Sequence, residues 1–315
     1  MNNTRNLTVI TVLLAIMLLA ACAPAQTAAT EAESVQEPAA DDSSEAVIEE
    51  SAGAGELTYV DGIPVYGCLG SADEALVDLE CREVTMAVEN AYLPFNYISS
   101  ETGRAGGWDY DVMSEICTRL HCTPVFQEVA WDILIQSIAD GLYDMSPNGI
   151  SITDDRREIV DFSMPYIIIE QRLLARAGED RFSTIEEFVD NPDLVIGTQT
   201  STTNLETAME YLPDDRINAF DLFPFAVQAL IGGDVDAVVI DEVAGLGFIA
   251  ENEGQIEFVG PSIASNPLGL VFPKGSELVA PFDQALQAMM DDGLLDEINE
   301  RYFGSEFMLT YDDIE

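Results

Sequence analysis

Along residues 82–145 the apolar positions switch repeatedly between a period of two and a helical period. Segments that alternate apolar and β-branched residues with polar ones are typical of β-strands, and apolar residues three or four apart indicate helices. Their order is strand, helix, strand, helix, strand, which predicts a parallel sheet wound with helices. The expected elements are strands at 83–88, 124–129 and 143–145, and helices at 110–120 and from Trp131 to Gly141.

The pattern continues through a second α/β unit and then returns to the first. A strand is expected to leave the first unit, and strands and helices alternate after it. The last elements, one strand and two amphipathic helices, are expected to complete the first unit. The predicted strands are 160–175, 193–198, 217–220, 236–241, 256–259 and 268–272. The predicted helices are one that follows 199–203 and ends at Tyr211, and those at 224–231, 243–250, 277–290 and 294–302.

This order implies an α/β fold with two lobes and a hinge. Lobe 1 is expected to contain residues 82–172 and 263–315, and lobe 2 residues 173–262. Two crossover segments, near 169–175 and 259–265, would join the lobes. In such sheets, ligands bind outside the carboxyl ends of the strands.

Residues 1–22 are typical of an export signal. Arg5 supplies a weak positive region, and the apolar run 7–21 is too short for a comfortable transmembrane helix. The run ends in Leu-Ala-Ala-Cys, which resembles the bacterial lipobox, in which the cysteine, here Cys22, is lipidated and becomes the new N-terminus. The alternative is an ordinary signal peptide with an incidental cysteine. We expect a chain held outside the cytoplasm, attached to the cell membrane by an N-terminal lipid.

Two further segments precede the lobes. Residues 23–56 are rich in Ala, Glu, Ser, Asp and Thr and lack an apolar period, so we expect a disordered acidic tether. Residues 57–81 contain short apolar pieces and several glycines, which indicates an irregular N-terminal extension.

The four cysteines beyond the lipobox are expected to form disulfides, because an even number outside the cytoplasm indicates oxidation. We pair near neighbours, Cys68 with Cys81 and Cys117 with Cys122. The alternative is a metal site at Cys117, His121 and Cys122, but no fourth ligand is evident and oxidation would compete for the thiolates. We therefore expect no metal.

The charge is strongly one-sided, with 58 acidic residues against 12 basic ones and a formal net charge of -46. Such a chain would repel nucleic acids and anionic membrane surfaces, so neither is an expected partner. Membrane contact is expected through the lipid alone.

One polar stretch, 148–156, combines groups that suit a small anionic ligand. Gly149 lets a ligand approach the backbone closely, and Ser151 and Thr153 offer hydroxyls. Arg156 offers a planar fork that suits a carboxylate.

Tyr92 and Trp131 also follow predicted strand ends, as the stretch 148–156 does. This coincidence favours a binding site. The alternative is a solvated loop whose Asp154 and Asp155 cap a helix.

From 82 to 304 the chain resembles the extracellular solute-binding proteins of ABC transporters, in the family that carries polar amino acids (the lysine/arginine/ornithine-, histidine- and glutamine-binding type). The order and spacing of several phrases carry the resemblance. The phrases are Ala91-Tyr92-Leu93-Pro94-Phe95-Asn96-Tyr97, Gly107-Trp108-Asp109-Tyr110-Asp111, Gly141-Leu142-Tyr143-Asp144, Ile150-Ser151-Ile152-Thr153-Asp154-Asp155-Arg156, Val160-Asp161-Phe162-Ser163-Met164-Pro165-Tyr166 and Asp234-Val235-Asp236-Ala237.

The resemblance implies a type 2 periplasmic-binding-protein fold whose lobes close on one amino acid. Carried over, Arg156 would clamp the α-carboxylate, with Ser151 and the turn at Thr202 and Thr203. Asp241 would take the α-ammonium, although it could instead be a helix cap. A zwitterion needs a cation and an anion at a fixed separation, and these two come from different lobes.

The same resemblance gives roles to five further residues. Asn148 and Gly149 would help to bind the ammonium, and Tyr92 and Trp131 would sandwich the ligand side chain. Glu89 stands where the family often keeps an acid near that side chain. The alternatives are core aromatics for Tyr92 and Trp131 and an ordinary surface acid for Glu89.

Two positions depart from the family pattern. Ser201 stands where the family usually has glycine, and Asn148 where a hydroxyl is common. Both bear on the identity of the ligand more than on its class. The expected partners are an amino acid, with polar or cationic side chains favoured, and an ABC transporter permease. We expect a monomer without a cofactor.

Two other functions share this fold. One is a periplasmic cyclohexadienyl or arogenate dehydratase, for which Glu89 is the evident candidate for a general acid. The other is a sensory domain, which a membrane span and a signalling module usually follow. The sequence reaches Glu315 without such a span or module. As a sensory protein, this chain would therefore be expected to present its ligand to a separate receptor. A non-enzymatic binding protein remains the leading hypothesis.

Overall fold

The computed structural model describes residues 57–304 and 306–314. The expected signal segment at 1–22, lipidation of Cys22 and the tether at 23–56 lie outside these residues. No helix in the described part combines the length and the hydropathy that crossing a membrane requires.

The first lobe is built on β3 (Glu83–Val88) and β7 (Thr123–Glu128), which pair in parallel and are connected by α1 (Trp108–Leu120). Strands β8 (Val160–Phe162) and β14 (Val271–Pro273) pair antiparallel. The strand expected at 143–145 is reduced to isolated bridges that link β3 to β14. The sheet is therefore mixed, because its last strand returns from the C-terminal part of the chain and runs in the opposite direction.

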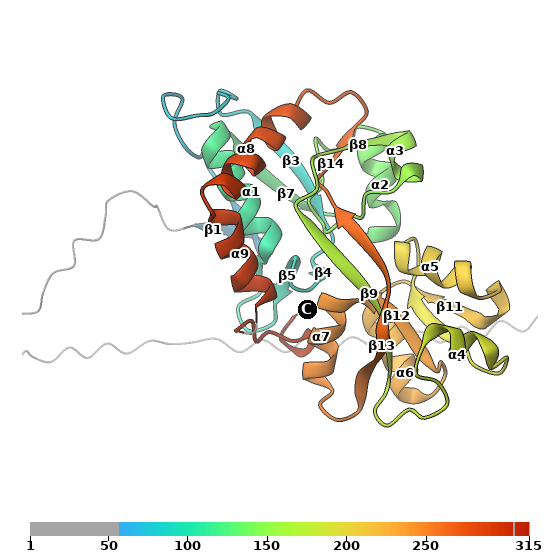
Figure 1. The fold of residues 1–315 in the computed structure, drawn as a ribbon. Helices are drawn as coiled ribbons and strands as arrows, with labels where there is room; N and C mark the ends of the chain where they lie inside the picture. Colours follow the sequence, from blue (N-terminus) through green and yellow to red (C-terminus); the bar gives the residue numbers. More distant parts are fainter. Residues whose placement is uncertain (1–56, 305, 315) are drawn as a thin grey trace, which may run out of the picture. The chain divides into compact units, whose positions relative to one another are not determined.

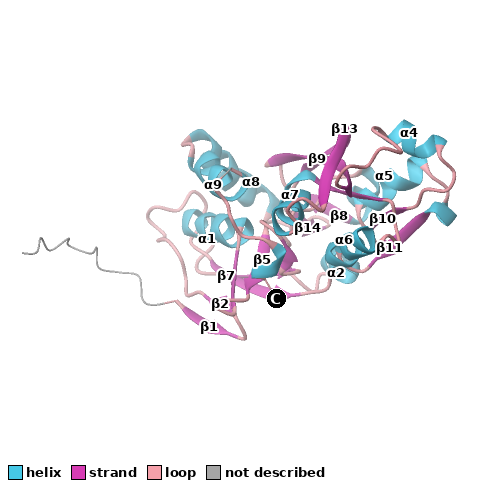
Figure 2. Ribbon diagram, turned by 90° about the horizontal axis from the view of Figure 1, so that it is seen from below, coloured by secondary structure: helices cyan, strands magenta, loops and turns pink. Residues whose placement is uncertain are grey.

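Smaller elements surround this sheet. A hairpin replaces part of the irregular extension that we expected, and a three-stranded antiparallel sheet follows β3. Helices α1, α8 and α9 gather at one end of the described body, and α4 and α5 at the other (Figure 2). The elements are β1 (Thr58–Val60), β2 (Ile63–Val65), β4 (Ala91–Tyr92), β5 (Asn96–Ser99), β6 (Arg104–Gly106), α2 (Trp131–Ala139), α3 (Asp154–Ile159), α8 (Val279–Asp291), α9 (Leu294–Phe303) and η2 (Tyr311–Asp313).

The second lobe contains a five-stranded sheet in the order β11-β10-β12-β9-β13. Strand β10 runs parallel to both of its neighbours, β11 and β12, whereas β9 is antiparallel to β12 and β13. The elements are β9 (Ile167–Arg176), α4 (Ile185–Asp190), β10 (Ile196–Gln199), α5 (Thr203–Tyr211), η1 (Asp214–Arg216), β11 (Ile217–Phe220), α6 (Phe223–Gly232), β12 (Ala237–Asp241), α7 (Glu242–Glu251) and β13 (Ile256–Leu268).

Two long strands, β9 and β13, run side by side between the lobes (Figure 1). They pair from Ile256 opposite Arg176 to Leu268 opposite Ile167, and the register shifts between Val259 and Ala264. The prediction of a short strand at 256–259 was wrong, because pairing with β9 extends β13 across the hinge. The shift falls in the crossover segment expected at 259–265, where an irregularity loosens the ladder.

Both expected disulfides are present, Cys68–Cys81 and Cys117–Cys122. The second one closes the end of α1, where Cys117 and Leu120 lie in the core. Residues 69–81 lie across this end of the helix and donate backbone N–H groups to its terminal carbonyls. A helix leaves its last four carbonyls without helical partners, so these bonds explain why the N-terminal extension docks here.

Candidate functional site

One cavity is lined by all ten residues that the sequence predicted to bind a ligand. Its walls come from strand ends and helix starts of both lobes, as expected for ligand sites in wound sheets. Three further residues, which the sequence analysis missed, complete the lining. The lining residues are Glu89, Tyr92, Trp131, Asn148, Gly149, Ser151, Arg156, Gln199, Thr202, Thr203, Asn204, Phe223 and Asp241.

Arg156 is buried, so the alternative of a solvated loop is wrong at this position. It lies in the first turn of α3, which Thr153, and not Asp154 or Asp155, caps by accepting from the Arg156 backbone N–H at 3.2 Å. The guanidinium donates to the carbonyl oxygens of Ser151, at 3.0 Å, and Ser201, at 3.3 Å. Burial lowers the pKa of Arg156, which means that its charge is poorly solvated.

Asp241 ends β12 on the opposite wall and accepts from the Tyr92 hydroxyl and from Asn204 Nδ2, the latter at 3.2 Å. It occupies the N-cap position of α7, but its side chain makes no capping bond. The helix-cap alternative is therefore wrong, since the carboxylate faces the cavity. Burial raises the pKa of Asp241.

Arg156 and Asp241 thus bring opposite charges from two lobes to one cavity. Among the ion pairs of the described residues, neither takes part in any. A buried charge without a charged partner is costly. A ligand that carried both an anionic and a cationic group would relieve both costs at once.

The lobes meet across the cavity through hydrogen bonds. The hydroxyls of Ser151 and Thr203 are 3.2 Å apart, and the Trp131 indole donates to the carbonyl of Thr200 at 3.2 Å. Thr202 caps α5 by accepting from the backbone N–H of Leu205 at 3.2 Å. The start of α5 therefore points backbone donors into the cavity, where an anion is favoured.

Gly149 has to be glycine here. Its φ is +57°, and an added Cβ would lie 2.7 Å from Cε1 of the Tyr92 ring. Tyr92 in turn stacks on Phe95, with the ring centroids 5.0 Å apart. The absence of a side chain at Gly149 thus lets the ring of Tyr92 form a wall of the cavity.

Asn148 is held by a buried network of amides and acids. Its Oδ1 accepts from the backbone N–H of Glu89 at 2.7 Å and from Asn96 Nδ2 at 2.9 Å. Asn96 Nδ2 also donates to Asp109 at 2.7 Å. The Nδ2 of Asn148 has no partner among the described residues, although it is buried. A buried donor without a partner is unfavourable, so this group suits a ligand acceptor.

Glu89 lies at the side of the cavity, where Gln199 Nε2 donates to its carboxylate at 3.3 Å. Burial raises the pKa of Glu89 to about 7, and the charge of Asp132 adds to the effect. The carboxyl is therefore poised between its two protonation states near neutral pH. The surface-acid alternative is wrong, because this acid is largely removed from water.

The three missed residues, Gln199, Asn204 and Phe223, lie at or after the ends of strands, as the predicted residues do. Gln199 ends β10, Asn204 follows the first residue of α5, and Phe223 begins α6. Applying the strand-end criterion to every predicted element would have found them. In the set considered as an alternative metal site, Cys117 and Cys122 bond to each other, and His121 contacts Cys81.

The chain is similar in sequence to a family of known proteins. The sequence profile of the bacterial extracellular solute-binding proteins, family 3, matches residues 84–305. The L-cystine-binding protein TcyJ of Escherichia coli (strain K12) is 25% identical over 238 residues, covering 75% of this chain and 88% of the relative. A probable histidine-binding protein of Campylobacter jejuni is 27% identical, covering 78% of this chain and 96% of the relative.

Solved structures agree in fold. An ancestral arginine-binding protein bound to arginine has a TM-score of 0.66 and 30% identity, covering 70% of this chain and 98% of that one. The ancestral amino acid-binding protein AncCDT-1, a precursor of cyclohexadienyl dehydratase, has a TM-score of 0.64 and 28% identity, covering 70% of this chain and 95% of that one.

Proposed function

The chain belongs to the bacterial extracellular solute-binding proteins, family 3, and from this premise we propose that it captures an amino acid with a cationic side chain between its lobes. The observation that carries the proposal is a pair of opposite charges, the buried Arg156 and the half-buried Asp241, on opposite walls of one cavity. The α-carboxylate would bind the Arg156 guanidinium and the start of α5. The α-ammonium would bind Asp241, next to the unpartnered Oδ1 of Asn204.

The preference for a cation rests on the acids around the side-chain end. Glu89 and Trp131 line both the cavity and a wider opening beside it. That opening also contains Glu128, Asp132 and Asp221. A guanidinium or ammonium that passes Glu89 would meet carboxylates and the face of Trp131, and both attract cations.

Binding to arginine and two analogues tests the two halves of the proposal. Citrulline has the length of arginine with a neutral end, and agmatine lacks the α-carboxylate. We expect arginine at 100 times its dissociation constant to add about 2.7 kcal/mol to the free energy of unfolding. Citrulline and agmatine should bind at least about tenfold more weakly, and Arg156→Ala should abolish the arginine effect.

The outcomes separate the claims. Equal binding of arginine and citrulline would remove the cation preference and keep the amino acid clamp. If no amino acid shifts the thermal unfolding transition in low or high salt, the clamp itself is wrong.

We further propose delivery of the amino acid to an ABC transporter permease, at the outer face of a membrane to which Cys22 attaches the chain. The family relationship and the lipobox-like sequence support this. Lobe 1 would comprise 82–172 and 263–315, and lobe 2 residues 173–262. Mass spectrometry of the membrane-extracted chain should find a diacylated N-terminal Cys22, and Cys22→Ser should release the protein into the soluble fraction.

A second candidate is an enzyme of the dehydratase type. The specific observation is Glu89, whose pKa near 7 suits a general acid toward a leaving hydroxyl. Incubation with prephenate or arogenate, followed by mass spectrometry for an aromatic product, tests it. An aromatic product that disappears in Glu89→Gln would establish the enzyme, and absence of product would leave the binding protein.

A further inference from the structure

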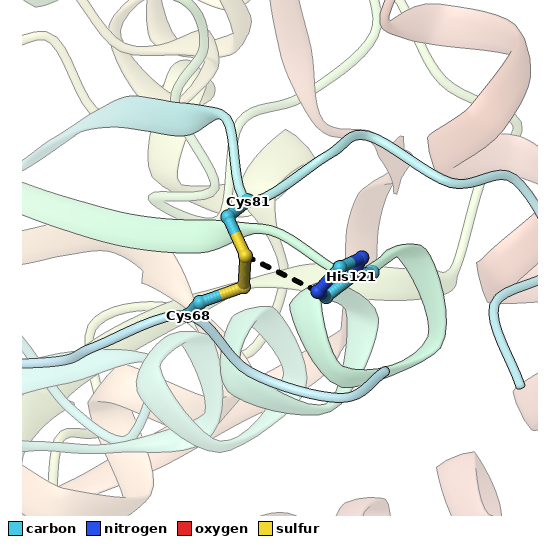
Figure 3. A group of neighbouring side chains, drawn as sticks. All are labelled: Cys68, Cys81 and His121. Atoms are coloured by element: carbon cyan, nitrogen blue, oxygen red, sulfur yellow. Dashed lines mark hydrogen bonds between the residues drawn. A yellow bond between two sulfur atoms is a disulfide. The ribbon is translucent and has the colours of Figure 1, made fainter. Parts of the chain in front are cut away.

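The N-terminal extension carries a side-chain arrangement that the ligand cavity does not use. The disulfide Cys68–Cys81 lies at the surface, and His121 Nε2 is 3.1 Å from the Cys81 sulfur. Figure 3 shows the imidazole beside the disulfide, with the contact drawn to the Cys81 sulfur. The other ring nitrogen, Nδ1, is 2.8 Å from a carboxylate oxygen of Asp78.

Each member of this arrangement is held in place. His121 is the C-cap residue of α1 in a left-handed conformation, with φ 52°, directly before the disulfide-bonded Cys122. The backbone N–H of Glu80 donates to Asp78 at 2.8 Å, which together with His121 lowers the pKa of Asp78. Asp78 is therefore ionised and accepts the Nδ1 proton. An N–H at Nε2, when the ring carries one, is directed at the Cys81 sulfur.

We propose that Cys68–Cys81 is a thiol–disulfide exchange site, in which an external dithiol attacks Cys68 and His121 assists the departure of Cys81. A thiolate of the dithiol would bond to the Cys68 sulfur while the S–S bond breaks. The electron pair goes to the Cys81 sulfur, which receives the Nε2 proton. The second thiol of the reagent then displaces Cys68, so the reagent becomes a disulfide and the protein gains two thiols.

Two features of the chain favour this direction of attack. Both cysteines are exposed, and His121 lies close to both sulfurs, but its Nε2 is in hydrogen-bond contact with the Cys81 sulfur, at 3.1 Å. A leaving thiol departs faster when its thiolate is stabilised, and an adjacent imidazolium does this. The second disulfide offers an internal reference, because Cys117 and Cys122 are fully buried. The exchange should therefore be selective for one disulfide and for one sulfur within it.

The charges around His121 are few. The carboxylate of Asp78 contacts its Nδ1, at 2.8 Å. Arg119, two residues earlier on α1, is paired with Glu115 and Asp292. Glu80 reaches the site through its backbone N–H to Asp78. Because the chain contains one histidine, replacing His121 removes its only imidazole.

The experiment uses the full chain with Cys22 alkylated beforehand. Limiting dithiothreitol, followed by alkylation and peptide mass spectrometry, should find Cys68 and Cys81 reduced before Cys117 and Cys122. Glutathione, a monothiol, should be trapped as a mixed disulfide on Cys68, with Cys81 alkylated. A mixed disulfide on Cys81, or equally on both, would overturn the proposal.

The role of the ring is tested with His121→Asn, because asparagine tolerates the left-handed conformation and carries no charge. After correction for the thiolate fraction of the reagent, the variant should be at least about threefold slower than the wild type, the effect of one unit in the leaving-thiol pKa at a slope of about 0.5. Asp78→Asn should lie between them, and equal rates in all three proteins would refute the assisting role of His121.

Discussion

At the scale of single residues, the ligand cavity concentrates groups that water no longer solvates. Burial lowers the pKa of Arg156 and raises those of Asp241 and Glu89. Each of these shifts is a free-energy cost to the empty protein, because the charged form is the one that burial disfavours. The cavity is therefore set for a ligand that supplies the missing opposite charges.

Glu89 allows this cost to be measured as a pH dependence. Its pKa rises from 4.5 to about 7 on folding. The folded state therefore binds the proton more tightly than the unfolded state, and stability falls as pH rises from about 4.5 to about 7. The shift corresponds to about 3 kcal/mol at most.

We therefore expect Glu89→Gln to lose less stability than the wild type between pH 5 and pH 8, measured by urea unfolding without ligand. Asp221→Asn, which removes an exposed acid of the same opening, is the matched control and should follow the wild type. Arginine should also bind the wild type more tightly at pH 8 than at pH 6, because ionised Glu89 is the form that attracts a cation. Parallel curves for wild type and Glu89→Gln would show that Glu89 is not the buried acid described here.

At the scale of elements, the sequence predicted the strands and helices whose pattern is local and missed those made by distant pairing. The period of apolar residues suffices for α1 and β3, since one face of each is buried. The full length of β13 depends on its pairing with β9, which no local pattern records. Tyr92 and Asp241 were found because strand ends are visible in the sequence, whereas the Arg156 contact with the Ser201 carbonyl depends on how the lobes meet.

Ser201, in the turn between β10 and α5, stands where the family usually has glycine. Its φ is 59°, in the left-handed region, where a non-glycine residue costs about 1–2 kcal/mol. Glycine would remove that cost and add about 0.5–1 kcal/mol of unfolded-chain entropy. We expect Ser201→Gly to be more stable by about 0.5 kcal/mol, seen as a higher urea midpoint with an unchanged slope.

The converse substitution is Gly149→Ala, also at a left-handed position. The added Cβ would collide with Tyr92, so this variant should lose more than about 1 kcal/mol and bind ligand poorly. A destabilised Ser201→Gly would mean that the serine side chain stabilises the turn by more than its backbone conformation costs.

At the scale of the whole described body, the C-terminal segment after α9 contacts both lobes. Tyr311 stacks on Phe248 of α7, with ring centroids 3.8 Å apart and planes 1° from parallel. The same segment bonds to the first lobe, where the backbone N–H of Ser100 donates to the carbonyl of Asp313 at 2.8 Å. The C-terminal segment after α9 therefore contacts both the first lobe and a helix of the second, beside the strands of the hinge.

We expect this stacking to favour the closed state in which a ligand is held. Phe248→Leu keeps an apolar side chain and removes the ring, at a cost of about 1 kcal/mol to the closed state. If the rings separate on opening, the apparent dissociation constant for the ligand should rise about fivefold, because only the closed, binding-competent fraction changes. Titration calorimetry measures the constant, and small-angle scattering with and without ligand measures closure.

Tyr66→Ala is the control for a general loss of aromatic packing. Tyr66 pairs with Phe126 at 6.1 Å, away from α7, so it should lower the melting temperature and leave the affinity unchanged. An unchanged affinity in Phe248→Leu, with a lower melting temperature, would mean that the C-terminal segment moves with α7 during opening. The hinge would then lie between the C-terminal segment and the first lobe, and Ser100 would mark the contact that breaks.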